Sequence, residues 1–426
     1  MSKKRNIVLS QDDIATICDV YDGIRFDFSK EEVLPLILGK DGKQLRSVTV
    51  NGEIRWYQIN RKKLEKTING LVSNQIIGSK WSADSLLNKL INALSVNKIN
   101  RVGNVKQEVT KFLEDIYAAE PVEYEICMPV YGVSIANGTC LDIGKYSFVH
   151  ADYLMKNKFP KMAGVDTLVE QSRGCHTECF VCINVSACEQ EKAKELALSE
   201  FKWIENAIRF SMPNKIYGAG ITSYDVKWTE WMVVAIKNSD SASFSTSLRG
   251  PLSPIKIEEL VKREDFKRMI EVLANPDTQL TEMQKRIKYA IYLCGLSLQT
   301  LDLSVSYFLC VAAMEALFCK QENPYVSPSI AQQIIESFCY LLVEEDKRRQ
   351  CFEDMQDLYR NRSAVAHGGE KSLTEEDVWQ ARMYLMFSVD MLLMDERLSK
   401  ITTITGLREL VKDIKFGKHK AREMMK

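Results

Sequence analysis

The feature that most constrains this chain is a helical spacing of apolar residues that runs from residue 256 to residue 415 with few interruptions. Apolar side chains that recur every three or four residues line one face of an α-helix, so the spacing predicts helices wherever it persists. Seven helices are expected in this part of the chain, over residues 256–274, 281–299, 303–320, 327–343, 346–367, 375–395 and 404–415.

Two local signals mark helix ends in this region. Thr374 is followed three residues later by Asp377, which resembles a capping box and predicts a helix that starts at about residue 375. Gly368 and Gly369 predict the end of the preceding helix, because glycine takes the left-handed conformation that a helix end needs. His367 is then expected in the last turn, where the negative end of the helix dipole favours the protonated imidazole.

The first 250 residues predict a mixture of strands and helices. Helical spacing fills much of the stretch from residue 64 to residue 116, and Ser239 to Pro254 predict a linker or long loop because they are rich in serine, glycine and proline. The other expected elements are strands over residues 54–59, 180–185 and 226–236, a helix over 191–210, and a hairpin in which residues 131–135 and 140–143 flank the Asn137-Gly138 turn.

These patterns predict an α+β protein that is mainly helical, with three domains. Residues 1–118 form a mixed, mostly helical region of unknown role, and residues 119–250 form a small α+β domain that would sense or regulate. Residues 251–426 form the helical C-terminal domain.

Composition narrows the class of protein and its partners. The chain has 426 residues, of which 46% are hydrophobic and 27% are charged, and Lys+Arg and Asp+Glu number 57 each. A net charge of zero provides no general attraction for nucleic acid, so any nucleic-acid contact must use a local patch. The longest apolar stretch, around residues 305–318, is shorter than the roughly 20 residues that cross a bilayer, so no membrane association is expected.

Twelve cysteines are spread along the chain, and its charged start does not lead into the long apolar core of a secretory signal. We therefore expect reduced thiols and a cytoplasmic location. One group has the ligand types for zinc, but its members Cys179 and Cys182 lie three apart in an expected strand and would point to opposite faces. No metal or cofactor is expected. The group consists of Cys175, His176, Cys179, Cys182 and Cys188.

The residues that carry recognisable chemistry lie in the segment from Arg360 to His367. An arginine that grips phosphate with two parallel hydrogen bonds, beside a histidine that accepts the proton of a 2′-hydroxyl, suffices to cleave RNA by internal attack, and no metal is required. The same residues also have a structural interpretation. In that interpretation Arg362 pairs with Glu315 to stabilise the helices, and His367 only ends a helix.

The spacing along the helix allows either of two arginines, Arg362 or Arg360, to act together with His367. Arg362 lies five residues earlier and about 140° away around an ideal helix, so the two converge only if the helix end unwinds or a second chain supplies one of them. Arg360 lies seven residues earlier and is nearly in line with His367. Geometry alone does not choose between these registers.

The segment 312–318, Ala-Ala-Met-Glu-Ala-Leu-Phe, is followed about forty residues later by the segment 358–368, Leu-Tyr-Arg-Asn-Arg-Ser-Ala-Val-Ala-His-Gly. Together they resemble the HEPN superfamily, and in particular the ApeA-like HEPN domains of bacterial defence proteins. Those domains carry an Ala-x-Glu-Ala-Leu-Phe-like helix and a Tyr-x-x-Arg-Ser-x-x-x-His-Gly-like helix end. The resemblance covers residues 280–395, and residues 180–210 are similar to a preceding domain of that family.

The resemblance implies a bundle of four or five helices that forms a homodimer, with Arg and His of both copies meeting across the interface. It implies a metal-independent endoribonuclease in which Arg362 holds the scissile phosphate, His367 acts as base or acid, and Glu315 orients one of them. Superfamily members often have a polar Asn, His or Asp after the arginine, whereas this chain has Ser363. Other members are inactive modules that bind RNA or protein.

Two further expectations follow from the resemblance: an alternative choice of working arginine and a biological role. Asn361 can act as the polar helper only if Arg360 is the working arginine. The family implies an antiphage, abortive-infection effector that cuts tRNA or another cellular RNA after a phage or host trigger. The preceding 250 residues would sense that trigger or restrain the nuclease.

Overall fold

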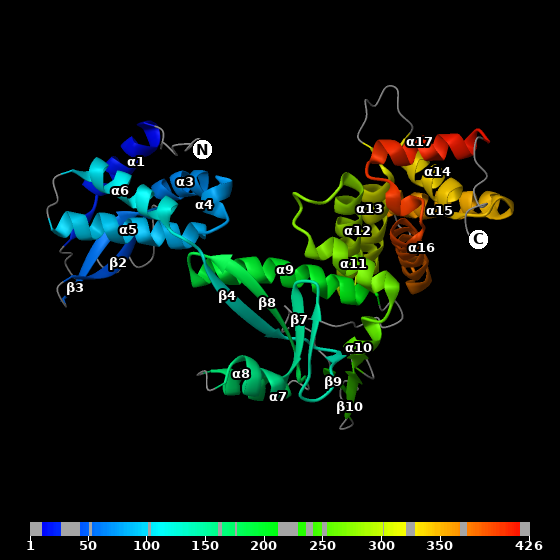
Figure 1. The fold of residues 1–426 in the computed structure, drawn as a ribbon, viewed down its shortest axis with the longest axis horizontal. Coiled ribbons are helices and arrows are strands. Elements are labelled where there is room, and N and C mark those ends of the chain that lie inside the picture. Colours follow the sequence, from blue (N-terminus) through cyan, green and yellow to red (C-terminus); the bar gives the residue numbers. More distant parts are fainter. Residues whose placement is uncertain are drawn as a thin grey trace. The chain divides into compact units, whose positions relative to one another are not determined.

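The computed structural model shows an α+β fold that is mainly helical, as the sequence predicts (Figure 1). Contacts divide the chain into two compact units, Met1–Ile126 with Asn184–Ala197 and Cys127–Ile183 with Leu198–Lys426. The predicted division at residues 118 and 250 differs from this one, because most of 119–250 shares a unit with 251–426. The structure describes residues 11–26, 43–50, 53–100, 104–160, 164–174, 177–211, 229–235, 242–248, 254–300, 302–320, 329–366 and 373–417.

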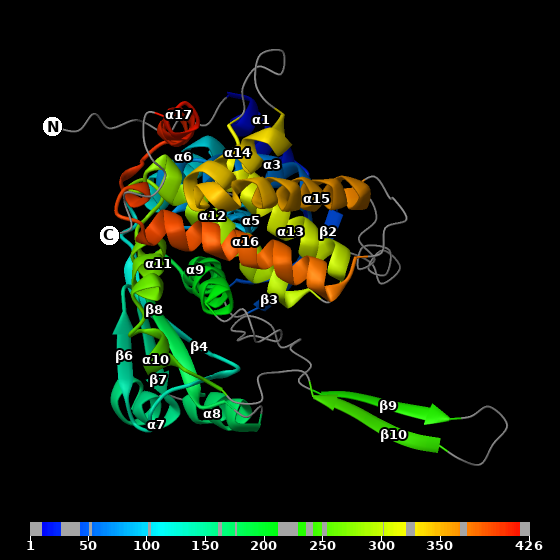
Figure 2. The same cartoon turned by 90° about the vertical axis from the view of Figure 1, so that its right-hand side faces the viewer.

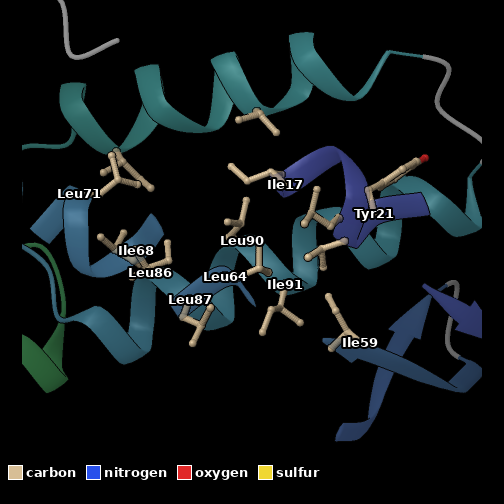
Figure 3. Packing of buried hydrophobic residues seen from close by; sticks show 14 of the residues in the cluster. Ile17, Tyr21, Ile59, Leu64, Ile68, Leu71, Leu86, Leu87, Leu90 and Ile91 are labelled. Atoms are coloured by element: carbon tan, nitrogen blue, oxygen red, sulfur yellow. The ribbon is translucent and has the colours of Figure 1, made fainter. Parts of the chain in front are cut away.

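The first unit packs its helices around one apolar core, which includes Ile17, Leu64, Leu90 and Ile91 (Figure 3). Its strands lie in the order β1-β3-β2, and β3 confirms the strand expected over 54–59. The elements are α1 (Gln11–Asp22), β1 (Arg25–Phe26), β2 (Lys43–Val50), β3 (Glu53–Asn60), α3 (Arg61–Val72), α4 (Gln75–Gly78), α5 (Ala83–Ile99) and α6 (Val105–Ala118).

A four-stranded sheet in the order β4-β8-β7-β6 follows in the chain, and β7 is antiparallel to both of its neighbours. Apolar residues of β7, β8 and α8 form a core that includes Val149, Val169 and Phe180. The elements are β4 (Val122–Pro129), β5 (Val133–Ser134), β6 (Cys140–Ile143), β7 (Tyr146–His150), α7 (Ala151–Tyr153), the short π-helix η2 (Leu154–Lys158), α8 (Val165–Gly174) and β8 (Cys179–Ala187).

The hairpin predicted around Asn137-Gly138 is wrong. Gly138 has a positive φ of 67° and the Thr139 amide donates to the Ala136 carbonyl, so a turn does form there. Its flanking segments do not pair, however, because β5 pairs in parallel with β11 (Ile255–Lys256). The hairpin joins β6 to β7 instead, through Gly144 at φ 60° and one further residue. The loops with Gly138 and Gly144 can both form a tight turn. The strand that is available to pair with β6, here β7, decides which of them becomes the hairpin turn.

Two other expectations from the first 250 residues need correction. The stretch 239–254, predicted as a linker, contains β10 (Ala242–Leu248), which forms an antiparallel pair with β9 (Thr229–Ala235). Serine and threonine tolerate a strand when a neighbouring strand takes up their backbone hydrogen bonds. The thiols are also not all reduced, since Cys127 and Cys182 of neighbouring strands form a disulfide.

The C-terminal helices follow the predicted spacing closely. The expected helix 256–274 is broken into α10 and α11, and the capping box at Thr374 and Asp377 is confirmed. No helix among the described residues has both the length and the apolar character needed to cross a bilayer. The helices are α10 (Ile257–Leu260), α11 (Glu264–Ala274), α12 (Glu282–Gln299), α13 (Leu303–Phe318), α14 (Ile330–Leu342), α15 (Arg348–Ala366), α16 (Glu375–Met394) and α17 (Ile404–Lys415).

Helix α13 is the central element of the bundle, because it packs against α12, α14, α15 and α16 (Figure 2). Its sequence is apolar almost all round, which is typical of a helix with neighbours on every side. Helix α9 (Gln190–Phe210) approaches α12 closely, because Gly295 leaves room for Asn206. Arg209 of α9 pairs with Glu205 in a buried ion pair, and it also donates a hydrogen bond to Gln299.

Candidate functional site

Glu315 is the one charged residue of α13 and lies in its last turn. A carboxylate in an apolar helix needs a partner, since the loss of hydration would otherwise disfavour the charge. The end of the helix around it is well fixed. Arg286 of α12 donates hydrogen bonds to the carbonyls of Ala316 and Cys319, at 2.6 and 2.9 Å. These bonds satisfy carbonyl groups that a helix end leaves without partners within the helix.

The partner of Glu315 is Arg362 of α15. The Arg362 Nε lies 3.2 Å from the Glu315 Oε1, and the two side chains are 23% and 22% exposed. The contact is an ion pair without hydrogen-bond alignment, because neither of these two buried atoms has a hydrogen-bond partner among the described residues. The structure therefore places together two of the residues that the sequence singled out, and it leaves the Nε–H of Arg362 without an acceptor there.

Two aromatic rings flank the guanidinium of Arg362. Its Cζ lies 5.1 Å from the ring centre of Phe308 and 5.8 Å from that of Tyr359, distances at which a cation is attracted to a ring face. Burial, and then the negative charge of the Glu315 carboxylate, raise the pKa of Tyr359. The cation is thus held by a carboxylate and two rings rather than by a single contact.

Sequence reasoning missed Phe308 and Tyr359, although their spacing contains a signal. Phe308 precedes Glu315 by two helical turns, so the two share a face of α13. Tyr359 precedes Arg362 by three residues, the spacing of neighbours on a helix surface. Which ring would contact the arginine could not be predicted, because it depends on how α13 and α15 pack.

The other two predicted residues of α15 point elsewhere. Arg360 is 74% exposed and pairs with Asp357 one turn earlier, at 2.9 Å. Exposed pairs of this kind contribute little to stability. Asn361 is buried and its amide lies 3.5 Å from an Asp377 carboxylate oxygen, so it connects α15 to the capping box of α16.

Buried polar contacts hold the end of α15 in place. The Tyr307 hydroxyl of α13 donates a 2.7 Å hydrogen bond to the Leu358 carbonyl, and burial raises its pKa. Asp377 accepts from both the backbone and the hydroxyl of Thr374 and also faces Asn361. The C-terminal end of α15 and the start of α16 are therefore fixed to the same group of side chains. His367, between them, lies outside the described residues, as do Gly368 and Gly369.

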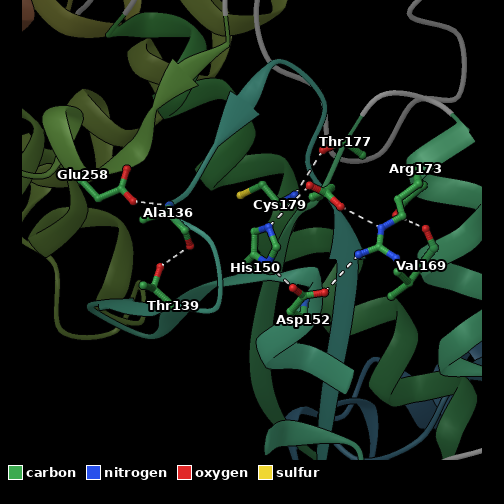
Figure 4. Close-up of polar contacts among 11 residues, drawn as sticks. Ala136, Thr139, His150, Asp152, Val169, Arg173, Thr177, Cys179 and Glu258 are labelled. Atoms are coloured by element: carbon green, nitrogen blue, oxygen red, sulfur yellow. Dashed lines mark hydrogen bonds and ion pairs between the residues drawn. The ribbon is translucent and has the colours of Figure 1, made fainter. Parts of the chain in front are cut away.

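A second polar cluster surrounds His150, where the sequence indicated no site (Figure 4). The buried His150 accepts a hydrogen bond from the Asp152 amide at Nδ1, and its Nε2 lies 3.6 Å from a Glu178 oxygen. Arg173 bridges Glu178 and Asp152, at 2.7 and 3.1 Å. Cys179 lies opposite His150 in the sheet, but burial raises the pKa of its thiol. A buried thiol that keeps its proton is a poor nucleophile, so this cluster fits a structural role.

The described cysteines of the group considered for zinc do not lie together as a set of ligands, because each has its own surroundings. Cys182 is bonded to Cys127, Cys179 is buried, and the Cys188 thiol lies 3.6 Å from the Ala119 carbonyl. Cys175 and His176 lie outside the described residues. Within the described ranges, no group of three or more His, Cys, Asp or Glu side chains is arranged to hold a metal ion.

Comparison with known proteins does not place the chain in a family. No family model, no curated protein and no solved structure matched it.

Proposed function

We propose that the C-terminal bundle is a HEPN-type endoribonuclease that cleaves RNA without a metal. The observation that carries this proposal is the setting of Arg362, a guanidinium held by Glu315 and two aromatic rings at the end of α15. Such a guanidinium is pre-oriented on its buried Nε side by Glu315, while the Arg362 side chain as a whole remains 23% exposed. A phosphate that meets the exposed part of the guanidinium would form the charge-assisted pair that arginine favours.

His367 follows Arg362 by five residues and is the proposed acid–base group. As base it would take the proton of the ribose 2′-hydroxyl, and the resulting oxygen would attack the adjacent phosphorus. The bond to the 5′-oxygen breaks, and that oxygen takes up a proton as it leaves. The products are a 2′,3′-cyclic phosphate and a free 5′-hydroxyl.

The proposed working form is a homodimer. Val305 and Phe308 of α13 are 47% and 38% exposed, and Phe308 contacts Arg362 and lies two helical turns before Glu315 on the same face. Exposed apolar side chains next to a functional group are typical of an interaction surface. A second copy would cover them and could bring its own Arg362 and His367 to the same interface.

The proposed setting is the bacterial cytoplasm, with tRNA or another cellular RNA as substrate in antiphage, abortive-infection defence. A free ribonuclease is toxic, so the first 250 residues would sense a phage or host trigger or restrain the nuclease. The motif resemblance at residues 312–318 and 358–368 supports this setting.

A second candidate function is a catalytically inactive HEPN module that binds RNA or protein. The ion pair of Arg362 and Glu315 favours it, because such a pair between two packed helices also fits a purely structural role. In this case Arg362 would contribute to stability or binding rather than to a reaction.

The two candidates are separated by RNA cleavage in the presence of EDTA. Wild type, Arg362→Ala, His367→Ala and Arg360→Ala would be compared at matched dimer content, on total tRNA and on a mixed RNA pool. Arg360→Ala is the matched control, since it removes the same charge from an exposed position of the same helix. We expect wild type and Arg360→Ala to leave 2′,3′-cyclic phosphate ends. The other two variants should be slower by about 100-fold or more.

The purified protein could lack a trigger that is present in cells, so the growth of cells that express the same variants is measured as well. Growth arrest by wild type and Arg360→Ala, relieved by Arg362→Ala and His367→Ala, would support the nuclease. The inactive module would be favoured if wild type neither cleaves RNA nor slows growth, and if wild type and His367→Ala bind RNA with equal affinity. Equal cleavage by wild type and Arg362→Ala would contradict the assigned site.

A further inference from the structure

Two free cysteines of the bundle are in contact. Cys339 lies near the end of α14 and Cys351 lies in the first turn of α15, and their sulfur atoms are 3.4 Å apart. Both side chains are buried. A disulfide needs the two sulfur atoms to approach to about 2.05 Å, a shift of about 1.3 Å. Small side-chain rotations can supply a shift of that size.

The two thiols are not equivalent. Cys339 donates a hydrogen bond to the sulfur of Cys351, which lowers the pKa of Cys351 and raises that of Cys339. Cys351 also lies in the first turn of α15, where the positive end of the helix dipole stabilises a thiolate. Arg348 adds a positive charge beside the pair, and its Nε and Nη2 have no hydrogen-bond partner among the described residues.

We propose that Cys339 and Cys351 are a redox modification site, which forms a reversible disulfide between α14 and α15 when it meets a low-molecular-weight disulfide. The Cys351 thiolate attacks one sulfur of that small disulfide, and its other half leaves as a thiolate. The Cys339 thiol then loses its proton and attacks the Cys351 sulfur, which expels the second half. Two protein thiols and one small disulfide thus become one protein disulfide and two small thiols.

The new bond would act on the α14–α15 contact and not on the candidate site. Cys351 and Arg362 lie at opposite ends of α15, about 16 Å apart along its axis. The bond would close a short loop of chain and reduce the freedom of the unfolded state. We therefore expect a more stable bundle with unchanged Arg362 contacts. The disulfide would form whether or not the bundle cleaves RNA.

The test uses the full-length protein, reduced and then exposed to oxidised glutathione under native conditions. Remaining thiols are blocked with an alkylating reagent, and the protein is digested with trypsin. The basic residues Lys347, Arg348 and Arg349 lie between the two cysteines, so trypsin releases them in separate peptides unless a disulfide joins them. Mass spectrometry should find the peptide of residues 321–347 linked to that of 350–360. Tm should rise by about 5 °C and return on reduction.

Serine variants provide the controls, since serine is close to cysteine in size. Cys339→Ser and Cys351→Ser should each abolish the linked peptide and the Tm shift. Cys294→Ser, at another buried cysteine of the same bundle, should leave both unchanged. The proposal is overturned if the linked peptide forms only in denaturant, or if the two cysteines are recovered only alkylated or as separate glutathione adducts.

Discussion

At the scale of single residues, two partly buried carboxylates of the bundle, Glu315 and Asp390, lie in different settings. Glu315 faces the guanidinium of Arg362, which compensates its charge. Asp390 of α16 is surrounded differently, because its Oδ1 has no hydrogen-bond partner among the described residues and Asp265 carries a like charge nearby. Burial, and then the repulsion from Asp265, raise the pKa of Asp390 to about 6, and Arg263 only partly offsets this. Asp390 therefore opposes folding once it is ionised.

The residue-scale prediction concerns Asp390→Asn. The folded state binds the Asp390 proton more tightly than the unfolded chain does, so wild type loses stability as the pH rises from 3.8 to about 6. The asparagine cannot ionise and avoids that loss. We expect the variant to gain about 1 to 2 kcal/mol in free energy of unfolding at pH 7.5, and little or nothing below pH 3.8.

Urea unfolding at several pH values measures this gain. Asp346→Asn, at an exposed carboxylate of the same bundle, is the control and should change stability little at any pH. If Asp390→Asn gains no free energy of unfolding at pH 7.5, or gains as much in acid, then ionised Asp390 does not destabilise the fold.

At the scale of elements, the contact between α9 and α12 depends on one glycine. A Cβ added to Gly295 would lie 2.6 Å from the Cα of Asn206, closer than real Cβ atoms come to backbone atoms. The two helices could accept it only by moving apart. Such overpacking typically costs 1–3 kcal/mol, although alanine has the higher helix propensity.

Gly295→Ala is therefore expected to destabilise the second unit by about 2 to 3 kcal/mol, as measured by thermal unfolding. Gly70→Ala is the matched control, because Gly70 lies in α3 with no atom within 4 Å of the position of its Cβ. That substitution should be neutral or stabilising by up to about 1 kcal/mol. Equal effects of the two substitutions would show that close approach at Gly295 is unimportant.

Elements also differ in how well their sequence predicts them. The helices from α12 to α17 were predicted within a few residues, because each buries a clear apolar face and several carry an N-cap, as at Thr281 and Thr374. The partners of β5 and β6 were predicted wrongly, because the two were expected to pair with each other, whereas β5 pairs with β11 and β6 pairs with β7. Strand pairing depends on contacts between distant segments, as when β5 pairs with β11. A local turn such as Asn137-Gly138 does not determine which strands become partners.

At the scale of the whole molecule, the proposed homodimer makes a prediction about the exposed face of α13. Val305→Glu would place a charge on that face, and it should weaken dimerisation by at least about tenfold, because a buried unpaired charge opposes association. Ile76→Glu, at a similarly exposed apolar residue of α4 in the other unit, should have no effect. Sedimentation equilibrium measures both.

A Val305→Glu protein that dimerises as tightly as wild type would place the interface elsewhere. If wild type itself is a monomer at all concentrations, the arrangement of two Arg362–His367 sets across one interface is wrong. The cleavage assay with Arg362→Ala would then have to be explained within a single chain.

The sequence by itself determined the mainly helical α+β class, the positions of the C-terminal helices, and the set of charged residues of interest, Glu315, Arg360 and Arg362. These follow from periodicity, caps and the isolation of one charge in an apolar helix, which are local properties. Only the tertiary structure decided that Arg362 rather than Arg360 faces Glu315, that Phe308 and Tyr359 flank it, and that Asn361 connects α15 to α16. Those outcomes depend on how α13, α15 and α16 are rotated against one another, and packing sets that rotation.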